Sequence, residues 1–467
     1  MSTRVHLIGI CGTGMATLAA LLKCRGHRVS GSDQHVYPPM SDFLAAEGIS
    51  AFEGYAAAHI TGDLDLVVVG NAISRGNPEL EAVLERRIRY CSLPEAVRDA
   101  FLWGARPIVV AGTHGKTTTT ALVGWLLTHA GLDPTVLVGG IARNFGPQGS
   151  SYRRGSGRHF VIEGDEYDSA YFDKTAKFLK YIPEVAVINN VEFDHADIYP
   201  DLDAVQTAFA RLVNLVPRNG LVLLGQDSVH AVALGRRAMS PVESFGLAAE
   251  PTWRADEIAV QEGRTRFAVR RLAEPFGRFD LPLLGTHNVR NALAAIAVGA
   301  WAGLSATAMA DALREFKGIK RRLEVVGVAR GVTVIDDFAH HPTAVHETIA
   351  ALRTAYPARR IWAVFEPRSG SSCRRVFQQE FARAFTRADE VIVAAVFRST
   401  LPVAERLDAE QLVSDLRAQG KRARHVVEID EIVRTLVAEV HEGDIAVLMS
   451  NGGFGGIHRK LLLALGN

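Results

Sequence analysis

The sequence has few cysteines, no excess of either charge and no long apolar run, and each absence excludes a class of protein. Its 467 residues include four cysteines with no C-x-x-C pair, which argues against a disulfide framework or a zinc site and favours a reducing cytoplasm. Lys and Arg number 52 against 51 Asp and Glu, without long runs of one sign, so we expect no nucleic-acid partner. No stretch reaches the ~20 apolar residues that span a bilayer, so we expect a soluble protein.

The first residues, "MSTRVHLIGICGTGMATLAALL", superficially resemble a secretory signal peptide. Glycines interrupt the apolar run, however, and no small-residue cleavage site follows it. We therefore expect a strand, a turn and a helix here.

Short β-branched or leucine-rich runs alternate with helical patterns along most of the chain, which predicts an α/β fold with parallel sheets. Length and pattern predict three domains, at residues 1–104, 105–325 and 326–467. The stretch from about 220 to 285 is less regular, and we expect it to form antiparallel strands attached to a parallel core. The strand predictions are "RVHLIG", "HRVSGSD", "DLVVVGNA", "IRYCS", "PIVVAG", "HFVIEGDE", "EVAVINN", "VTVIDD", "RIWAVFEP", "EVIVAAV" and "DIAVLMSNGGFGG".

Residues 109–127, "VVAGTHGKTTTTALVGWLL", contain the more informative of two glycine turns. A strand, Gly-x-x-Gly-Lys-Thr and a helix would let backbone N–H groups surround phosphate oxygens, with Lys116 near the β- and γ-phosphates and the Thr117 hydroxyl on Mg²⁺. The spacing departs from the usual G-x-x-x-x-G-K-[ST] loop, because Val110 occupies its first glycine position. The alternative is a lysine that merely begins a surface helix.

The earlier turn contains Gly9, Gly12 and Gly14, and Asp33 follows about 20 residues later. This context suits a dinucleotide site, with pyrophosphate at the helix N-terminus and the acid on a ribose hydroxyl. The order G-x-x-G-x-G is not that of G-x-G-x-x-G, however, so the spacing does not favour a nicotinamide site. A packing turn without a ligand, or a site for a different diphosphate, are the alternatives.

Acidic residues follow two predicted strands of the second block. One group is Glu163, Asp165, Glu166 and Asp168, and the other is Glu192, Asp194 and His195. If the strands are parallel neighbours, both groups lie at the ligand edge of the sheet and could hold Mg²⁺ against nucleotide phosphates. Taken singly, each acid could instead be a solvated loop residue or a helix cap.

The third block begins with "VTVIDDFAHHPT". Zinc is disfavoured here, because adjacent residues of an extended segment point apart and no third ligand is nearby. We favour a nucleotide-contacting loop, with a polar loop as the alternative. Arg321 and Arg322 precede it, either as a solvated turn or as phosphate and base contacts.

These stretches together resemble the Mur ligases, the ATP-dependent amide-forming enzymes of peptidoglycan synthesis. The matching stretches are "GICGTGM", "AGTHGKTTTT", "EGDEYD", "NNVEFDHAD", "GTHNVRNALAA", "RRLE" and "DDFAHHPTA", in that order. The shortened phosphate loop of that family accounts for the spacing at Val110. The resemblance implies a Rossmann-like N-terminal domain for a UDP group, a central P-loop ATPase domain and a Rossmann-like C-terminal domain for the incoming amine.

The resemblance also implies roles for single residues. Lys116, Glu163 and His195 are expected to be catalytic, and Mg²⁺ to be held by Thr117, Glu163 and His195. The residues expected to contact ATP are Gly112, Thr113, Gly115, Lys116, Thr117, Thr118, His287, Asn291, Arg322, Asp337 and His340. The residues expected to contact the other substrates are Gly12, Gly14, Asp33 and Asn144, with Arg368 on the amine substrate.

Several other stretches resemble family members that join the tripeptide L-alanyl-γ-D-glutamyl-meso-diaminopimelate to UDP-N-acetylmuramate in peptidoglycan recycling. They include "EYDSAYFDKTAKF", "EPRSGSS" and "MSNGGFGGIH". Some relatives carry a carbamylated lysine after the D-H motif, whereas this chain has no lysine between Lys180 and Lys317, as in the alanine-adding and tripeptide-adding branches. The alternatives are a ligase that adds a single L-alanine, a nicotinamide-dependent dehydrogenase and a P-loop switch protein. No protein partner is implied.

Overall fold

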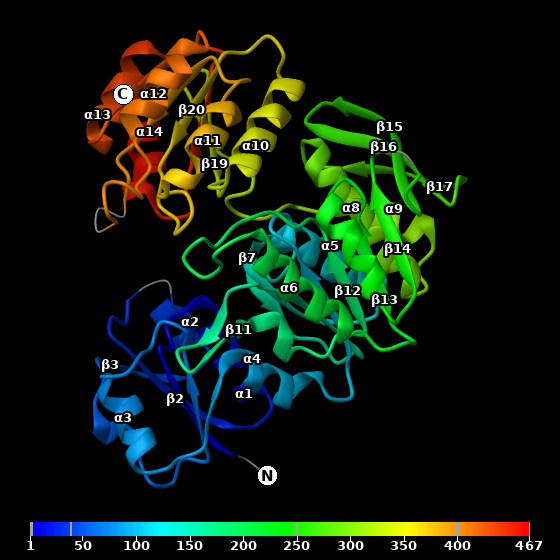
Figure 1. Cartoon of the computed structure of the whole chain (residues 1–467), viewed down its shortest axis with the longest axis vertical. Helices are drawn as coiled ribbons and strands as arrows, with labels where there is room; N and C mark the ends of the chain where they lie inside the picture. Colours follow the sequence, from blue (N-terminus) through cyan, green and yellow to red (C-terminus); the bar gives the residue numbers. More distant parts are fainter. Residues whose placement is uncertain (1–2, 38–39, 249, 398–400, 467) are drawn as a thin grey trace. The chain divides into compact units, whose positions relative to one another are not determined.

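A computed structural model describes residues 3–37, 40–248, 250–397 and 401–466 of the chain (Figure 1). The chain divides into two compact units. The first unit comprises Met1–Glu192, Asp203–Arg254 and Leu293–Ala312, and the second comprises Phe193–Leu202, Ala255–Ala292 and Leu313–Asn467. The division into domains at 1–104, 105–325 and 326–467 stays a prediction.

The N-terminal part of the first unit is a five-stranded parallel sheet in the order β3-β2-β1-β4-β5. Its strands are β1 (Arg4–Ile8), β2 (Arg28–Asp33), β3 (Ser50–Glu53), β4 (Leu66–Val69) and β5 (Tyr90–Ser92), and its helices are α1 (Thr13–Cys24), α2 (Met40–Ala46), α3 (Pro78–Glu85) and α4 (Leu93–Val97). The strand, turn and helix expected at the N-terminus are confirmed. The sequence did not predict β3, because this edge strand has no buried residue to mark it.

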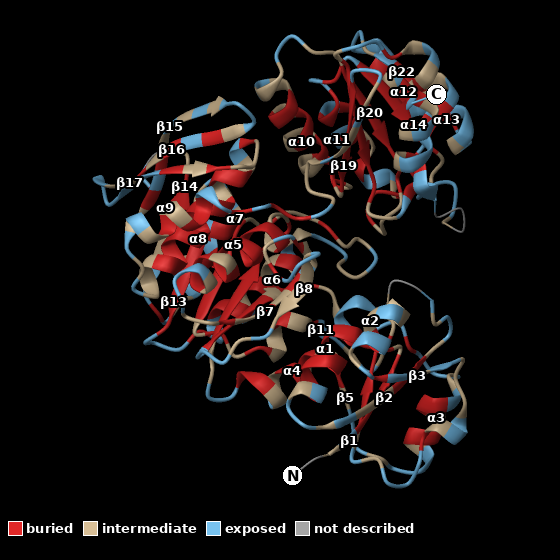
Figure 2. Cartoon of the chain, turned by 180° about the vertical axis from the view of Figure 1, so that it is seen from behind, coloured by how far each residue is buried: buried red, intermediate tan, exposed pale blue. Residues whose placement is uncertain are grey.

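The central sheet of the first unit has the order β14-β13-β12-β6-β9-β7-β8, and all its pairs are parallel except β7 with β8. The strands are β6 (Arg106–Ala111), β7 (Thr135–Ala142), β8 (Ser150–Arg153), β9 (His159–Gly164), β12 (Val185–Ile188), β13 (Leu221–Gly225) and β14 (Val242–Gly246). The helices are α5 (Lys116–His129), α6 (Leu202–Asn214) and α7 (Val229–Ala233). Strands β10 (Asp168–Ala170) and β11 (Asp173–Ala176) form a separate two-stranded antiparallel sheet. Strands β6, β12 and β13 are buried along most of their length, and the centre of this sheet is drawn in red in Figure 2.

The expectation of antiparallel strands from about 220 to 285 was right for only part of that stretch. Strands β16 (Arg264–Arg271) and β17 (Glu274–Leu281) form an antiparallel hairpin. Strands β13 and β14 were predicted wrongly, since β13 runs parallel to β12 and β14 runs parallel to β13. Each follows a helix that returns the chain to the same end of the sheet, as parallel pairing requires. The start of β15 (Trp253–Gln261) also pairs parallel with β14. The remaining elements are α8 (Thr286–Trp301) and α9 (Ala306–Arg314).

The C-terminal part of the second unit is a six-stranded sheet in the order β18-β19-β23-β20-β21-β22, in which β18 alone is antiparallel to its neighbour. The strands are β18 (Glu324–Ala329), β19 (Val332–Asp337), β20 (Ile361–Phe365), β21 (Glu390–Val393), β22 (Arg422–His425) and β23 (Ile445–Met449). The helices are α10 (Pro342–Ala355), α11 (Gln378–Ala384), α12 (Ala409–Ala418), α13 (Ile429–Glu439) and α14 (Ile457–Gly466). The expected α/β class is therefore confirmed.

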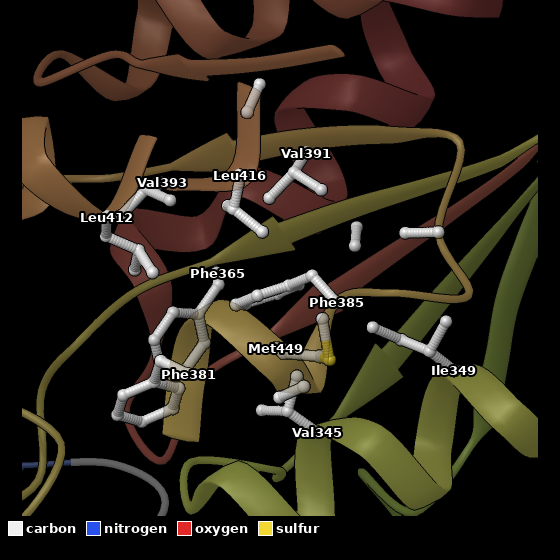
Figure 3. Close-up of a cluster of buried hydrophobic side chains, with 14 of the residues drawn as sticks. Val345, Ile349, Phe365, Phe381, Phe385, Val391, Val393, Leu412, Leu416 and Met449 are labelled. Carbon is white, nitrogen blue, oxygen red and sulfur yellow. The ribbon is translucent and has the colours of Figure 1, made fainter. Parts of the chain in front are cut away.

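One face of this sheet is covered by a continuous apolar core. Figure 3 shows Phe365 of β20 beside Phe381 and close to Phe385, with Val345 and Ile349 of α10 at the near side. The ring centroids of Phe365 and Phe381 lie 4.9 Å apart. The core holds the carboxyl ends of β19, β20 and β23 at one edge, from which the polar loops of this sheet emerge. Among the described residues, no helix is long and apolar enough to cross a membrane.

Candidate active site

The glycine turn after β6 has the geometry of a phosphate-binding loop. Gly115 adopts φ 81° at the N-cap of α5 and Gly112 adopts φ 127°, conformations that side chains other than glycine rarely take. A Cβ at Gly112 would also lie 3.0 Å from the backbone N of Asn189. The backbone N–H of His114 donates to the Asn190 side chain at 2.8 Å. The loop is therefore fixed against the segment after β12, with its glycines at the two strained positions.

Lys116 begins α5 and forms a buried ion pair. Its Nζ lies 3.0 and 2.9 Å from the two carboxylate oxygens of Glu166, and it donates to the Gly112 carbonyl at 2.7 Å. Burial alone would lower the pKa of Lys116, but the charges of Glu166 and Asp165 raise it above its ordinary value. The lysine is thus held as an ammonium ion at the mouth of the loop, as a phosphate contact requires. From the sequence, Glu166 was expected only as one of the acids that could hold Mg²⁺, and its pairing with Lys116 was not predicted.

Thr117 and Glu163 come together at the next position of the loop. The Thr117 hydroxyl donates to Glu163 Oε2 at 3.2 Å, and the backbone N–H of Gly139 donates to the other carboxylate oxygen. A Cβ at Gly139 would lie 2.9 Å from Glu163 Oε2. These are the hard oxygen donors that Mg²⁺ prefers, so the residues present fit that ion. Thr113 and Thr118, also expected near the nucleotide, are buried beside this loop.

The earlier glycine turn is closed by the predicted acid. The backbone N–H of Cys11 donates to Asp33 Oδ2 at 2.8 Å, which joins the end of β2 to the turn after β1. Gly12 is the N-cap of α1, and Gly14 lies in its first turn. The structure therefore brings together three of the residues expected to contact a diphosphate, at a helix N-terminus, where anions bind favourably.

Two contacts join α1 and the residue after α2 to β8 within the first unit. The Tyr152 hydroxyl donates to Glu47 Oε1 at 3.0 Å, and the hydroxyls of Thr17 and Ser151 lie 3.2 Å apart. Asn144, expected to contact substrate, lies half-buried in the turn between β7 and β8. Asn144 therefore lies in the segment that leads into β8, the strand that α1 contacts.

The segment Phe193–Leu202 belongs to the second unit. Asp194 is buried, and its carboxylate accepts from the backbone N–H of His195 at 2.7 Å. Burial alone would raise the pKa of Asp194, but His195, His341 and His340, together with the Ser371 hydroxyl, hold it well below its usual range. His195 has φ 51°, uncommon for a residue with a side chain. Such outliers are frequent at functional sites.

Asp337 lies at the end of β19, at the carboxyl edge of the sheet. Its carboxylate accepts from the backbone N–H groups of Leu323 and Ala339, at 2.7 and 2.8 Å. Burial raises the pKa of Asp337, and the charge of Arg322 opposes that rise in part. Arg322 lies over the ring of Phe338 at 4.9 Å, and His340 Nδ1 is 2.8 Å from the Phe338 carbonyl. Three predicted ATP contacts therefore lie around one loop.

His287 and Asn291 lie in the first turns of α8. His287 Nδ1 is 3.7 Å from Glu347 Oε2 of α10, and Arg290 reaches the other carboxylate oxygen at 3.3 Å. Burial alone would raise the pKa of Glu347, but His287 and Arg290 lower it to about 2. Asn291 Nδ2 donates to the Asn288 side chain at 3.1 Å. The sequence carried no signal for Glu347, because it lies within an ordinary helical pattern.

Arg368 follows β20, as expected for a residue at a strand end. Its guanidinium lies 3.7 Å from the ring centroid of Phe397 and 3.6 Å from a carboxylate oxygen of Glu366. Of the predicted residues, the first unit therefore contains the phosphate loop, Glu163, the earlier turn and Asn144. The second unit contains His195, His287, Asn291, Arg322, Asp337, His340 and Arg368.

Comparison with known proteins matches nearly the whole chain to one family. The matching family descriptions are "Mur ligase family, catalytic domain" over residues 4–101, "Mur ligase middle domain" over 110–299 and "Mur ligase, glutamate ligase domain" over 321–452. The UDP-N-acetylmuramate–L-alanyl-γ-D-glutamyl-meso-2,6-diaminoheptandioate ligase of Escherichia coli K12 is 41% identical, over 98% of this chain and 97% of that protein. A UDP-N-acetylmuramate–L-alanine ligase of Desulforapulum autotrophicum is 35% identical over 98% of each chain. The crystal structure of a murein peptide ligase from Psychrobacter arcticus matches with TM-score 0.73 and 36% identity, covering 100% of this chain and 99% of that one.

Proposed function

The chain belongs to the Mur ligase family, and from that premise we propose that it joins UDP-N-acetylmuramate to the tripeptide L-alanyl-γ-D-glutamyl-meso-diaminopimelate, with release of ADP and phosphate. The observation that carries this proposal is the 41% identity, over 98% of the chain, to a relative whose name states those substrates. The alanine-adding relatives are less similar, at 35% to 37% for three of them. The ion pair of Lys116 at the glycine loop supports the ATP-dependent part.

The proposed reaction has two steps, formation of an acyl phosphate and formation of the amide. A carboxylate oxygen of the muramoyl group attacks the γ-phosphorus of ATP, the bond from that phosphorus to the β,γ-bridging oxygen breaks, and ADP leaves. The tripeptide α-amine then attacks the acyl carbon, loses a proton, and phosphate leaves as the amide forms. Both partners of the first step are anions, so the ammonium group of Lys116 supplies stabilisation that increases as charge develops on the transferring phosphoryl group.

In this proposal, Lys116 exchanges the Glu166 carboxylate for phosphate oxygens when the nucleotide binds. In the structure described here, the carboxylate of Glu166 neutralises the ammonium group. Phosphate oxygens would take over part of that role at the same atom, because the loop amides and Lys116 surround one position. The buried pair therefore keeps the lysine charged and aimed at the loop in the absence of ATP.

Thr117 and Glu163 are the residues proposed to hold Mg²⁺ beside the nucleotide phosphates. A bound Mg²⁺ ion would supply further neutralisation of the phosphate charge. The resemblance assigns His195 to a second Mg²⁺, and we propose the same role here. A metal-binding imidazole has no lone pair left to accept a proton from the amine, so His195 is not proposed as the general base.

The remaining predicted contacts divide by substrate. The earlier glycine turn and Asp33 are proposed to bind the uridine diphosphate, with Asn144 on the same substrate. His287, Asn291, Arg322, Asp337 and His340 are proposed to contact ATP. Arg368 is proposed to pair with a carboxylate of the tripeptide, because a guanidinium can bind such a group through two parallel hydrogen bonds.

Phosphate release in the presence of ATP, Mg²⁺ and UDP-N-acetylmuramate tests the proposal. The tripeptide and L-alanine are compared as the amine, and the UDP-linked product is identified by mass spectrometry. We expect turnover with the tripeptide and little with L-alanine. Turnover with L-alanine alone would instead establish the alanine-adding activity, and hydride transfer to a nicotinamide would overturn the ligase assignment.

The cellular location proposed for this reaction is the cytoplasm. ATP and the UDP-sugar are both nucleotides of that compartment, and the four cysteines are free thiols, as is usual in a reducing environment. Cell fractionation with an antibody against the chain measures this directly, and recovery in an extracytoplasmic fraction would contradict it.

A further inference from the structure

Arg368 lies in a restricted position beside an exposed aromatic ring. Its guanidinium carbon is 3.7 Å from the centroid of Phe397, which is 55% exposed. The same guanidinium is 3.6 Å from Glu366 Oε1, and the Arg368 side chain is 31% exposed. A stacked guanidinium keeps its N–H groups at its edge, where a carboxylate that approaches from solvent can meet them.

The space that Arg368 occupies exists because residue 452 has no side chain. A Cβ built at Gly452 would lie 2.1 Å from Arg368 Nε, 2.3 Å from Cδ and 2.6 Å from Cζ. All three atoms belong to the flexible end of one arginine, so a methyl group there would displace that side chain rather than the backbone. Gly452 is not among the residues with positive φ, so its backbone conformation suits alanine.

The backbone at Gly452 is fixed by several hydrogen bonds. Its N–H donates to the Ser450 hydroxyl oxygen at 2.9 Å, and that hydroxyl in turn donates to Glu366 Oε2. Arg321 donates to the carbonyls of Ser450 and Gly452, at 2.7 and 2.6 Å. Glu366 is 7% exposed. The loop after β23 therefore cannot easily move aside, and a larger residue at 452 would exclude Arg368 from its place.

We infer that Gly452 is a specificity-determining position, since its missing side chain lets Arg368 lie on Phe397 and bind a peptide carboxylate remote from the reacting amine. This inference rests on the proposed function. A free amino acid such as L-alanine carries its only carboxylate next to the amine. The tripeptide carries others farther along, so the site formed by Arg368, Phe397 and Gly452 favours a substrate of the second kind.

Gly452→Ala tests the inference, with Gly453→Ala as the matched control. Gly453 also has an ordinary conformation, φ −75°, and no atom of the described residues lies within 4 Å of its Cβ position. Loss of a charge-assisted hydrogen-bonded pair is worth about 10- to 100-fold in binding. We expect Gly452→Ala to raise the KM for tripeptide by about that factor, with the KM values for ATP and UDP-N-acetylmuramate within about twofold. Gly453→Ala should leave all three unchanged.

A double-mutant comparison separates this mechanism from a general loss of structure. Arg368→Ala should raise the KM for tripeptide similarly, and adding Gly452→Ala to it should have little further effect, because the displaced side chain is already gone. Full additivity, an equal rise in the KM for ATP, or an unchanged KM for tripeptide in Gly452→Ala would each overturn the inference.

Crystal structures of the full-length wild type and Gly452→Ala provide a readout that does not depend on turnover. We expect the guanidinium to leave the Phe397 ring in the variant, and its retention there would overturn the inference. Absence of tripeptide-dependent phosphate release by the wild type would refute the proposed function instead. The two failures are therefore distinguishable.

Discussion

Replacing Lys116 with methionine should destabilise the nucleotide-free protein as well as abolish turnover. The ion pair with Glu166 is short, at 2.9 Å, and the two side chains are only 13% and 3% exposed. Removing one partner of a buried pair costs about 3–5 kcal/mol, because the other charge stays in a medium of low dielectric constant. For a domain of about 150–250 residues, each kcal/mol lowers Tm by about 2–4 °C. We therefore expect Tm to fall by about 6–20 °C.

The double variant Lys116→Met/Glu166→Gln separates the structural role from the chemical one. Two neutral side chains replace the pair, so the Tm of the double variant should be close to that of the wild type. Phosphate release should not return, because no cation then contacts the transferring phosphoryl group. Thermal unfolding of the ligand-free protein and ATP-dependent phosphate release are the two measurements.

Lys174→Met is the matched control for this experiment. Lys174 also pairs with a carboxylate, that of Asp168 at 2.8 Å, but its side chain is 67% exposed, and exposed pairs contribute about 0–1 kcal/mol. Its Tm should stay within about 4 °C of the wild type. A Tm for Lys116→Met as close to the wild type as that of the control would refute the buried-pair reasoning, and retained turnover would refute the phosphate role.

Three further substitutions test other parts of the site. Gly112→Ala should raise the KM for ATP at least about tenfold, because φ 127° and the 3.0 Å approach to Asn189 both oppose a side chain; an unchanged KM in steady-state assays would contradict this. Glu163→Gln should raise the Mg²⁺ concentration needed for half-maximal phosphate release by about tenfold or more, since one anionic ligand oxygen is lost; a Mg²⁺ titration that matches the wild type would count against the site. Glu347→Gln should lower stability by up to about 3 kcal/mol, because the pKa of Glu347 is lowered to about 2 in the folded protein. That contribution is complete above the unfolded pKa of about 4.3 and is lost as pH falls through about 2, so Tm values of variant and wild type should converge near pH 2; a constant difference would refute the assignment.

Features that depend on near neighbours in the sequence were the ones predicted correctly. The strand, glycine loop and helix at residues 109–127 were predictable because each part depends on near neighbours, namely an apolar run, glycines with positive φ and a helical pattern. Strands β3, β18 and β22 were not predicted. Their residues include exposed or charged side chains, as is common at sheet edges.

The directions of β13 and β14 show a second limit. Their sequences are compatible with parallel or antiparallel pairing, and only the intervening helices α6 and α7 return the chain to the starting edge. The site shows the same limit. Lys116 and Glu166 are 50 positions apart in the sequence. Lys116 follows β6 and Glu166 follows β9, and the parallel pairing of these two strands brings both residues to the same edge of the sheet. No hydrophobic or helical periodicity in the sequence indicates that two residues so far apart are in contact.

The sequence by itself therefore determined the α/β class, the family, the phosphate loop and the types of residue available for catalysis. These depend on local backbone preferences and on the order of motifs along the chain. The tertiary structure alone decided which carboxylate neutralises Lys116, which acid faces His287, and that Gly452 makes room for Arg368. Such contacts join residues far apart in sequence, and their geometry is set by the packing of sheets and helices between them.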